Sequence, residues 1–78
     1  MTADNSPEFS LTGRGSRAFH NKEYGELNHD ELDALVYIAY QASEGPLSAF
    51  EIGMNLKSPN VLETLRSLAR KGYVSEVR

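Results

Sequence analysis

The sequence predicts a mainly α-helical domain of three helices and one short β-strand, preceded by a flexible N-terminal arm. Two observations favour this fold class. Apolar residues recur every three or four positions in three separate stretches after residue 26, which is the spacing of one helix face. A segment rich in β-forming residues then follows Gly72. We therefore place the arm at residues 1–26 and the folded domain at residues 27–78.

The strongest helical pattern lies in residues 58–77, SPNVLETLRSLARKGYVSEV. Ser58 and Asn60 are alternative N-caps, so the sequence places the helix start within two residues. Gly72 ends the helix, because glycine adopts the left-handed conformation at least cost. Residues 73–77 then read as a strand. The predicted inward stripe of this third helix consists of Val61, Leu65, Leu68 and Ala69.

A first helix is predicted over residues 27–45. Asn28 and Glu31 have the spacing of a capping box, in which each side chain binds the backbone of the other residue. Gly45 and the proline after it end the helix. The acidic residues of the first turns are explained by capping and solvation: Asp30, Glu31 and Asp33. The predicted inward face consists of Leu32, Leu35, Val36 and Ala39, widened by Ile38 and Ala42.

A second, shorter helix is predicted from Ser48, which forms another capping box with Glu51, to about Lys57. Gly53 lowers helix propensity by about 1 kcal/mol relative to alanine, so we expect a close helix crossing there. Residues 45–47 are extended and can pair with the C-terminal strand. The predicted inward face consists of Ala49, Ile52, Gly53 and Leu56.

Residues 1–26 are rich in Ser, Gly, Asn and Thr and show no sustained hydrophobic period, which is typical of a flexible arm. Its large apolar residues leave an alternative open, in which residues 19–24 pack on the domain or on a partner. Arg14 and Arg17 resemble a basic arm for a DNA minor groove, although two arginines are common in any flexible tail. The large apolar residues are Phe9, Leu11, Phe19 and Tyr24.

The composition narrows the classes of function. The 78 residues include no cysteine, have a net charge of −3, and contain no apolar run of the ~20 residues that span a bilayer. His20 and His29 lack zinc-site spacing, and no phosphate-binding loop or nucleophile elbow occurs. We therefore expect a cytoplasmic protein without membrane association, metal, cofactor or catalytic activity. Residues 46–78 are nevertheless positive, with five Lys and Arg against three Glu.

Two consecutive segments resemble the winged-helix branch of the helix-turn-helix proteins, as found in small prokaryotic transcriptional repressors. They are PLSAFEIGMNLKS (46–58) and VLETLRSLARKGYV (61–74). The resemblance implies a positioning helix followed by a recognition helix that enters the major groove of DNA. In such families the chain continues through a hairpin wing into a further strand, whereas this sequence ends at Arg78. The motif residues are Leu65, Leu68, Gly72, Tyr73 and Val74.

The resemblance predicts a small DNA-binding transcriptional regulator that acts as a dimer and uses its third helix in the major groove. Short polar side chains would meet bases and cationic ones phosphates. The alternative is a winged-helix-like adaptor that binds protein, favoured by the net acidity, the missing wing, Glu63 and aromatic residues off the main stripes (Tyr37, Tyr40, Phe50). The predicted base contacts are Asn60, Thr64 and Ser67. The predicted phosphate contacts are Lys57, Arg66, Arg70 and Lys71.

The helix assignments predict a shared core of Leu35, Ile52, Leu56, Leu65 and Leu68. Replacing Leu65 by alanine should lower the free energy of unfolding by about 2–5 kcal/mol, because it leaves a cavity in that core. Thermal or urea denaturation measures the change. A Leu65→Ala variant as stable as the wild-type chain would contradict the assignment of the third helix.

Overall fold

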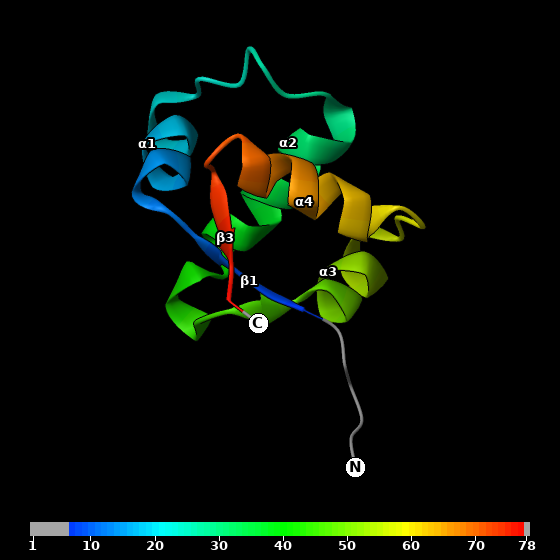
Figure 1. Ribbon diagram of the computed structural model, residues 1–78. Helices are drawn as coiled ribbons and strands as arrows, with labels where there is room; N and C mark the ends of the chain where they lie inside the picture. The colour runs from blue at the N-terminus through cyan, green and yellow to red at the C-terminus, as the bar shows by residue number, and fades with distance from the viewer. Residues whose placement is uncertain (1–6, 78) are drawn as a thin grey trace.

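The computed structural model describes residues 7–77 and contains four α-helices, one 3₁₀ turn and a small sheet (Figure 1). The protein is therefore mainly helical with a minimal β-component, as expected. The part of the predicted flexible arm before residue 7 lies outside the described residues. The elements are β1 (Glu8–Leu11), α1 (Gly13–Asn21), α2 (His29–Tyr40), η1 (Ala42–Glu44), β2 (Leu47–Ser48), α3 (Ala49–Leu56), α4 (Val61–Arg70) and β3 (Val74–Glu76).

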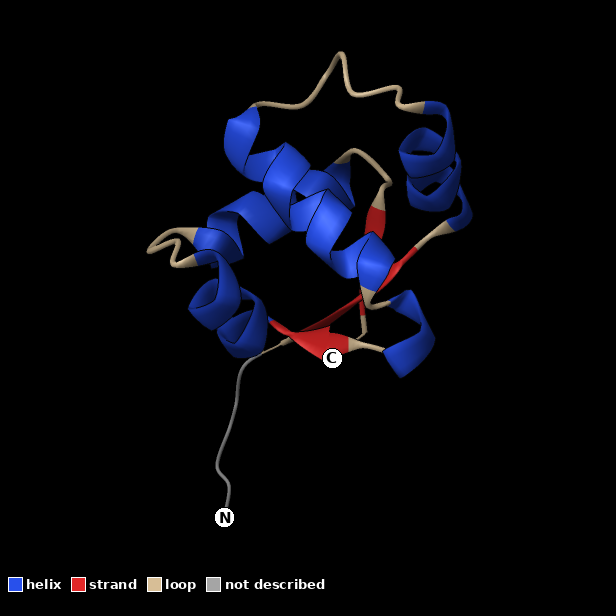
Figure 2. Cartoon of the chain, turned by 180° about the vertical axis from the view of Figure 1, so that it is seen from behind, coloured by secondary structure: helices blue, strands red, loops and turns tan. Residues whose placement is uncertain are grey.

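The three strands form an antiparallel sheet in the order β2-β1-β3. Phe9 of β1 lies opposite Leu47 on one side and Glu76 on the other. The expected pairing of residues 45–47 with the C-terminal strand is thus wrong, because β1 lies between the two. In Figure 2 the three strands lie together beside the longer helices. The N-terminal strand therefore holds the sheet together.

The structure differs from the expected flexible arm over residues 7–26. Phe9 is fully buried, and its strand leads directly into α1. Thr12 joins this segment to the far end of the chain: its hydroxyl donates to the Gly72 carbonyl (2.6 Å) and accepts from the Gly15 amide (3.0 Å). Because the contact between Thr12 and Gly72 spans 60 residues, the N-terminal segment is part of the domain.

Helix α1 packs closely against the turn after α4. Gly15 is buried, and a Cβ atom at this position would lie 2.0 Å from the carbonyl oxygen of Tyr73. Only glycine permits this approach, although it disfavours helix formation. Further along, the Phe19 ring meets the exposed Tyr40 ring edge-on at 5.5 Å, and Tyr24 packs against the core. The alternative in which residues 19–24 pack on the domain is therefore confirmed.

The buried face of α2 is turned by one residue from the predicted one. Glu31, Ala34, Leu35 and Ile38 are buried, whereas Leu32, Val36 and Ala39 are only half-buried. The prediction assumed that only apolar residues lie on the inward face. The buried carboxylate of Glu31 lies on that face, so the assumption was wrong. Leu56 of the predicted core is also half-buried. The largest fully buried side chains are Phe9, Leu35, Ile38, Ile52, Leu65, Leu68 and Val74.

Two glycine predictions for α3 and α4 are confirmed. A Cβ atom at Gly53 would lie 2.9 Å from Cγ1 of Val61, so the two helices cross closely there. Gly72 has φ +90° and ends the turn after α4. Helix α4 itself begins at Val61. Asn60 precedes it without a side-chain capping hydrogen bond.

None of the helices within residues 7–77 has the length and apolar character that a membrane crossing requires.

Replacing Phe9 by alanine should lower the free energy of unfolding by about 3–5 kcal/mol, because it empties a fully buried site. Phe50→Ala is the matched control, since that side chain is 63% exposed. Urea denaturation followed by circular dichroism measures both. Similar losses in the two variants would contradict the placement of β1 within the core.

Candidate functional site

A buried carboxylate, Glu31, lies at the start of α2. It is only 3% exposed, and it is the one buried charged residue among those whose burial the structure describes. The predicted capping box is confirmed: the Glu31 amide donates to Oδ1 of Asn28 (2.9 Å), and Oε1 of Glu31 accepts from the Asn28 amide (3.0 Å). Glu31 thus satisfies the backbone at the helix start while pointing inward, so solvation does not explain this residue.

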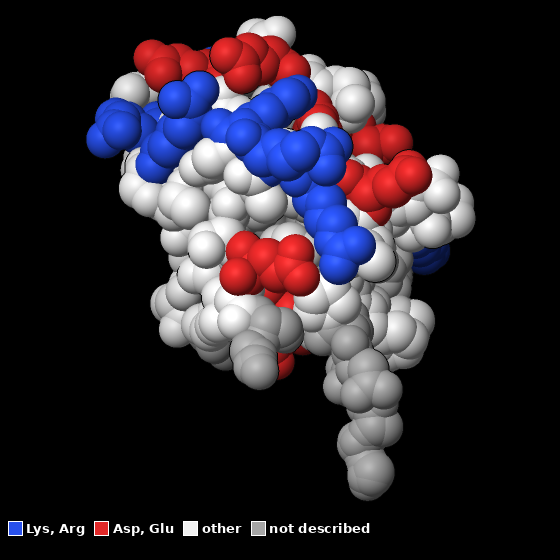
Figure 3. Space-filling model, viewed as in Figure 1, with Lys and Arg blue, Asp and Glu red and all other residues white. Residues whose placement is uncertain are grey.

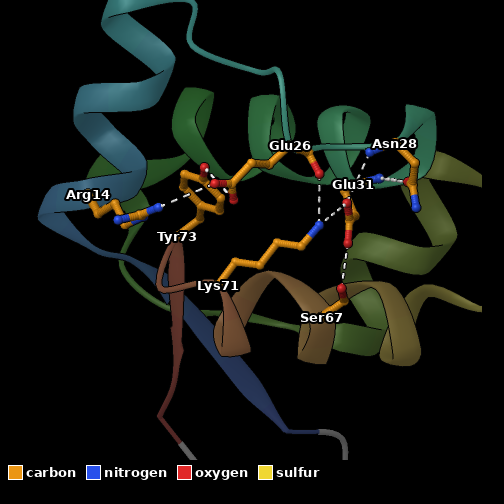
Figure 4. A network of polar contacts seen from close by, with 7 residues as sticks. All are labelled: Arg14, Glu26, Asn28, Glu31, Ser67, Lys71 and Tyr73. Carbon is orange, nitrogen blue, oxygen red and sulfur yellow. Dashed lines mark hydrogen bonds and ion pairs between the residues drawn. The ribbon is translucent and has the colours of Figure 1, made fainter.

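The same carboxylate binds two residues of the predicted DNA-binding set (Figure 4). Ser67 donates its hydroxyl proton to Oε2, and Nζ of Lys71 donates to Oε1 at 2.9 Å. Burial alone would raise the pKa of Glu31. The hydrogen bonds from Ser67, Lys71 and Asn28, together with the charge of Lys71, outweigh it and lower the pKa below its ordinary value. Glu31 is therefore held as a carboxylate that links α2 to α4.

A second group of polar contacts surrounds Glu26, in the loop before α2 (Figure 4). Its backbone carbonyl accepts from Nζ of Lys71 at 2.9 Å, and its carboxylate accepts from the Tyr73 hydroxyl at 3.5 Å. The carboxylate also lies 4.0 Å from the guanidinium of Arg14, which stands 5.0 Å above the Tyr73 ring. These contacts bring Arg14 of α1 beside the C-terminal end of α4.

Lys and Arg side chains gather in one band that crosses α1 and α4 (Figure 3). Acidic side chains flank the band in the same view. Helix α1 contributes two arginines, and α4 with its C-cap contributes three cations. We call these five residues the basic band: Arg14, Arg17, Arg66, Arg70 and Lys71.

The cations of the basic band differ in how far their charge is compensated. Lys71 is bound to Glu31, Arg14 lies near Glu26, and Nε of Arg66 lies 3.5 Å from Glu76. Arg17 and Arg70 are exposed and make no ion pair with any residue in the described range. These two arginines are therefore the most available for an anionic partner.

An open polar groove of about 470 Å³ lies between the start of α2 and the outer face of α4. It contains both carboxylates and guanidinium groups, so its charge is mixed. It brings together five of the seven predicted DNA-binding residues. The other two, Lys57 and Lys71, do not line it. The lining residues are Asn28, Asp30, Glu31, Asn60, Glu63, Thr64, Arg66, Ser67 and Arg70.

The predicted set therefore divides into separate groups. Ser67 and Lys71 bind Glu31 inside the protein and hold α4 in place. Lys57 caps the end of α3, at the opposite end of α4 from Arg70. Because α4 has ten residues, it is about 15 Å long, and Lys57 lies away from the basic band.

Sequence reasoning left Arg14 and Arg17 out of the site because they lay in the predicted flexible arm. Two signals pointed the other way: Thr12 stands at N-cap position, and Phe9 and Leu11 alternate with polar residues. Both signals were short, and the glycines on either side of Arg14 argued against a helix. The contact between Arg14 and Tyr73 depends on chain folding and leaves no local pattern.

Within residues 7–77, no group of three or more His, Cys, Asp or Glu side chains is placed to hold a metal ion. In comparisons with known proteins, no family model, no curated protein sequence and no solved structure matches this chain. The geometry described above is accordingly the basis for assigning a function.

Replacing Glu31 by glutamine should lower the free energy of unfolding by about 1–3 kcal/mol at neutral pH, because charge-assisted hydrogen bonds are lost. The pKa of Glu31 is lower in the folded protein than its ordinary value of 4.5 in the unfolded chain. Its carboxylate therefore stabilises the fold at pH values above 4.5, and this stabilisation is lost as the pH falls through the folded-state pKa. Wild-type and variant stabilities should therefore converge in acid.

Urea denaturation at a series of pH values measures this convergence. Asp30→Asn is the matched control, because Asp30 is the exposed acidic neighbour on the same helical turn. A gap between wild-type and Glu31→Gln stability that stays constant from neutral to acidic pH would contradict the role of the charged carboxylate.

Proposed function

We propose that this chain is a small DNA-binding transcriptional regulator of the winged-helix type, which holds duplex DNA against its basic band. The observation that carries the proposal is that α1 and α4, from opposite ends of the chain, place their cations on one face. Such a band suits the phosphate backbone, which supplies most of the affinity in sequence-independent DNA binding.

The order of the elements supports the winged-helix part of the proposal. Helix α2, strand β2, helices α3 and α4, and strand β3 follow one another in the order that the resemblance implies. The strand expected after a hairpin wing would lie antiparallel beside β3, and β1 occupies that position. Under this proposal β1 would take the role of the strand that the resemblance expects from later in the chain.

The proposed contacts follow from exposure and charge. Arg17 and Arg70 would bind phosphates first, because no ion pair in the described range compensates them. Asn60, just before α4, and Thr64 line the groove and would reach base edges in the major groove. Arg66 can exchange its exposed partner Glu76 for a phosphate, since surface ion pairs stabilise by ~0–1 kcal/mol.

A protein-binding adaptor is the second candidate function, and the mixed charge of the groove favours it. Asp30 and Glu63 line the groove together with Arg66 and Arg70. Carboxylates at this position repel phosphate, whereas they complement a protein surface that carries both signs of charge. Under this hypothesis the arginines bind acidic groups of a protein partner.

Binding of wild-type protein to a duplex of about ten base pairs, one turn of DNA, should weaken steeply with salt. Arg17→Ala and Arg70→Ala should each lower the slope of log affinity against log salt by about 0.9, because each removes one phosphate contact. Fluorescence anisotropy at several salt concentrations measures the slope. So short a duplex accommodates about one copy of the protein.

Lys57→Ala is the charge-matched control, because it removes one positive charge at a distance from the basic band. Its salt slope should equal that of the wild-type protein. A slope reduced as much as that of Arg70→Ala would contradict the location of the DNA-binding face. Negligible binding at low salt by wild-type and variant proteins would reject DNA binding and leave the adaptor hypothesis.

A further inference from the structure

Glu63 is a carboxylate on the outer face of α4 to which the proposed function assigns no role. It is exposed, it lines the polar groove, and it makes no ion pair with any residue in the described range. Spacings of three, four and seven residues place Arg66, Ser67 and Arg70 on the same face of the helix. This face is therefore acidic in its first turn and basic in its last.

The position of Glu63 along α4 separates it from the phosphate that Arg70 would bind. Seven residues of helix place the two residues about 10 Å apart along the axis, and charges in water are screened beyond about 8 Å at physiological ionic strength. Glu63 lies in sequence between Asn60 and Thr64, the two proposed base contacts that line the same groove. The N-terminal residues of a recognition helix are the ones that meet base edges, so Glu63 would face a base.

We propose that Glu63 recognises a cytosine in the major groove, by accepting a hydrogen bond from its N4 amino group. This inference rests on the proposed DNA-binding function. A carboxylate can only accept, and cytosine is the base that presents a donor without an acceptor in the major groove. Guanine presents two acceptors, thymine an acceptor and a methyl group, and adenine an acceptor beside its donor. Glu63 thus attracts cytosine and repels the acceptors of the other bases.

The groove contains a second exposed carboxylate, Asp30, which provides a contrast. Asp30 also makes no ion pair in the described range, but it belongs to α2, which the proposed function does not place in the major groove. Its charge should therefore weaken binding to every sequence alike. Glu63 should weaken binding mainly to sequences that lack the cytosine, and a difference of affinities is what constitutes specificity.

Selection of binding sites from a library of randomised duplexes gives the preferred sequence of each protein. The wild-type protein should favour cytosine at one position by at least about fivefold, the smaller effect of one mismatched base pair. Glu63→Ala should lose this preference, and Glu63→Gln should shift it toward adenine, which offers glutamine both a donor and an acceptor. Asp30→Asn is the control and should bind all sequences more tightly with the preference intact. Circular dichroism establishes that the variants keep their helices.

The hydrogen bond itself is tested by changing one atom of the selected duplex. N4-methylcytosine keeps the hydrogen that pairs with guanine and replaces the one that faces the major groove. This change should weaken wild-type binding by at least about fivefold and leave the affinity of Glu63→Ala unchanged. A wild-type protein without the cytosine preference, a preference that survives in Glu63→Ala, or an equal loss in both proteins would overturn this inference alone. Negligible DNA binding by the wild-type protein at low salt would overturn the proposed function as well.

Discussion

The structure depends most on one buried carboxylate, Glu31, which receives hydrogen bonds from the start of its own helix and from two residues of α4. A buried charge is costly unless it is paired and fully hydrogen-bonded. Asn28, Ser67 and Lys71 together meet this requirement, and no buried side-chain polar atom in the described residues lacks a partner. Because the partners must be directed at one point, this contact fixes how α4 lies across α2. The outer face of α4 is therefore presented in one orientation.

The N-terminal strand provides the second constraint. Strands β2 and β3 each pair with β1 and not with one another, so the sheet exists only while β1 lies between them. The hydroxyl of Thr12 and the absent side chain of Gly15 then bring α1 against the turn at Gly72 and Tyr73. The cations of α1 reach α4 only through this arrangement. The basic band thus depends on the chain's topology. A change that displaces β1 from the core would also move the cations of α1 away from α4 and alter the proposed DNA-binding face.

The features predictable from sequence were those with local physical causes. The capping box of α2, the cap that Ser48 provides for α3, the positive φ of Gly72 and the close approach at Gly53 each follow from the chemistry of neighbouring residues. Features that depend on distant residues could not be predicted in the same way. Glu31 was read as a solvated cap because its partners lie on α4, and β1 was read as part of a flexible arm because both of its neighbouring strands come later in the chain. Among the site residues, Asn60, Thr64, Arg66, Ser67 and Arg70 do share a groove, but Ser67 and Lys71 also bind Glu31.

The net charge of −3 does not by itself oppose binding of an anionic partner. At physiological ionic strength charges are screened beyond about 8 Å, so a phosphate responds to its immediate surroundings more than to the whole chain. What matters is whether the nearby carboxylates can be displaced. The Arg14–Glu26 and Arg66–Glu76 pairs are exposed, and such pairs stabilise little in water, so a phosphate can replace the carboxylate at small cost. The Lys71–Glu31 pair is different, because Glu31 is buried and losing its partner would leave an uncompensated charge in the core. Lys71 therefore contributes to the fold, and the exchangeable arginines on either side of it are the ones free to contribute to binding.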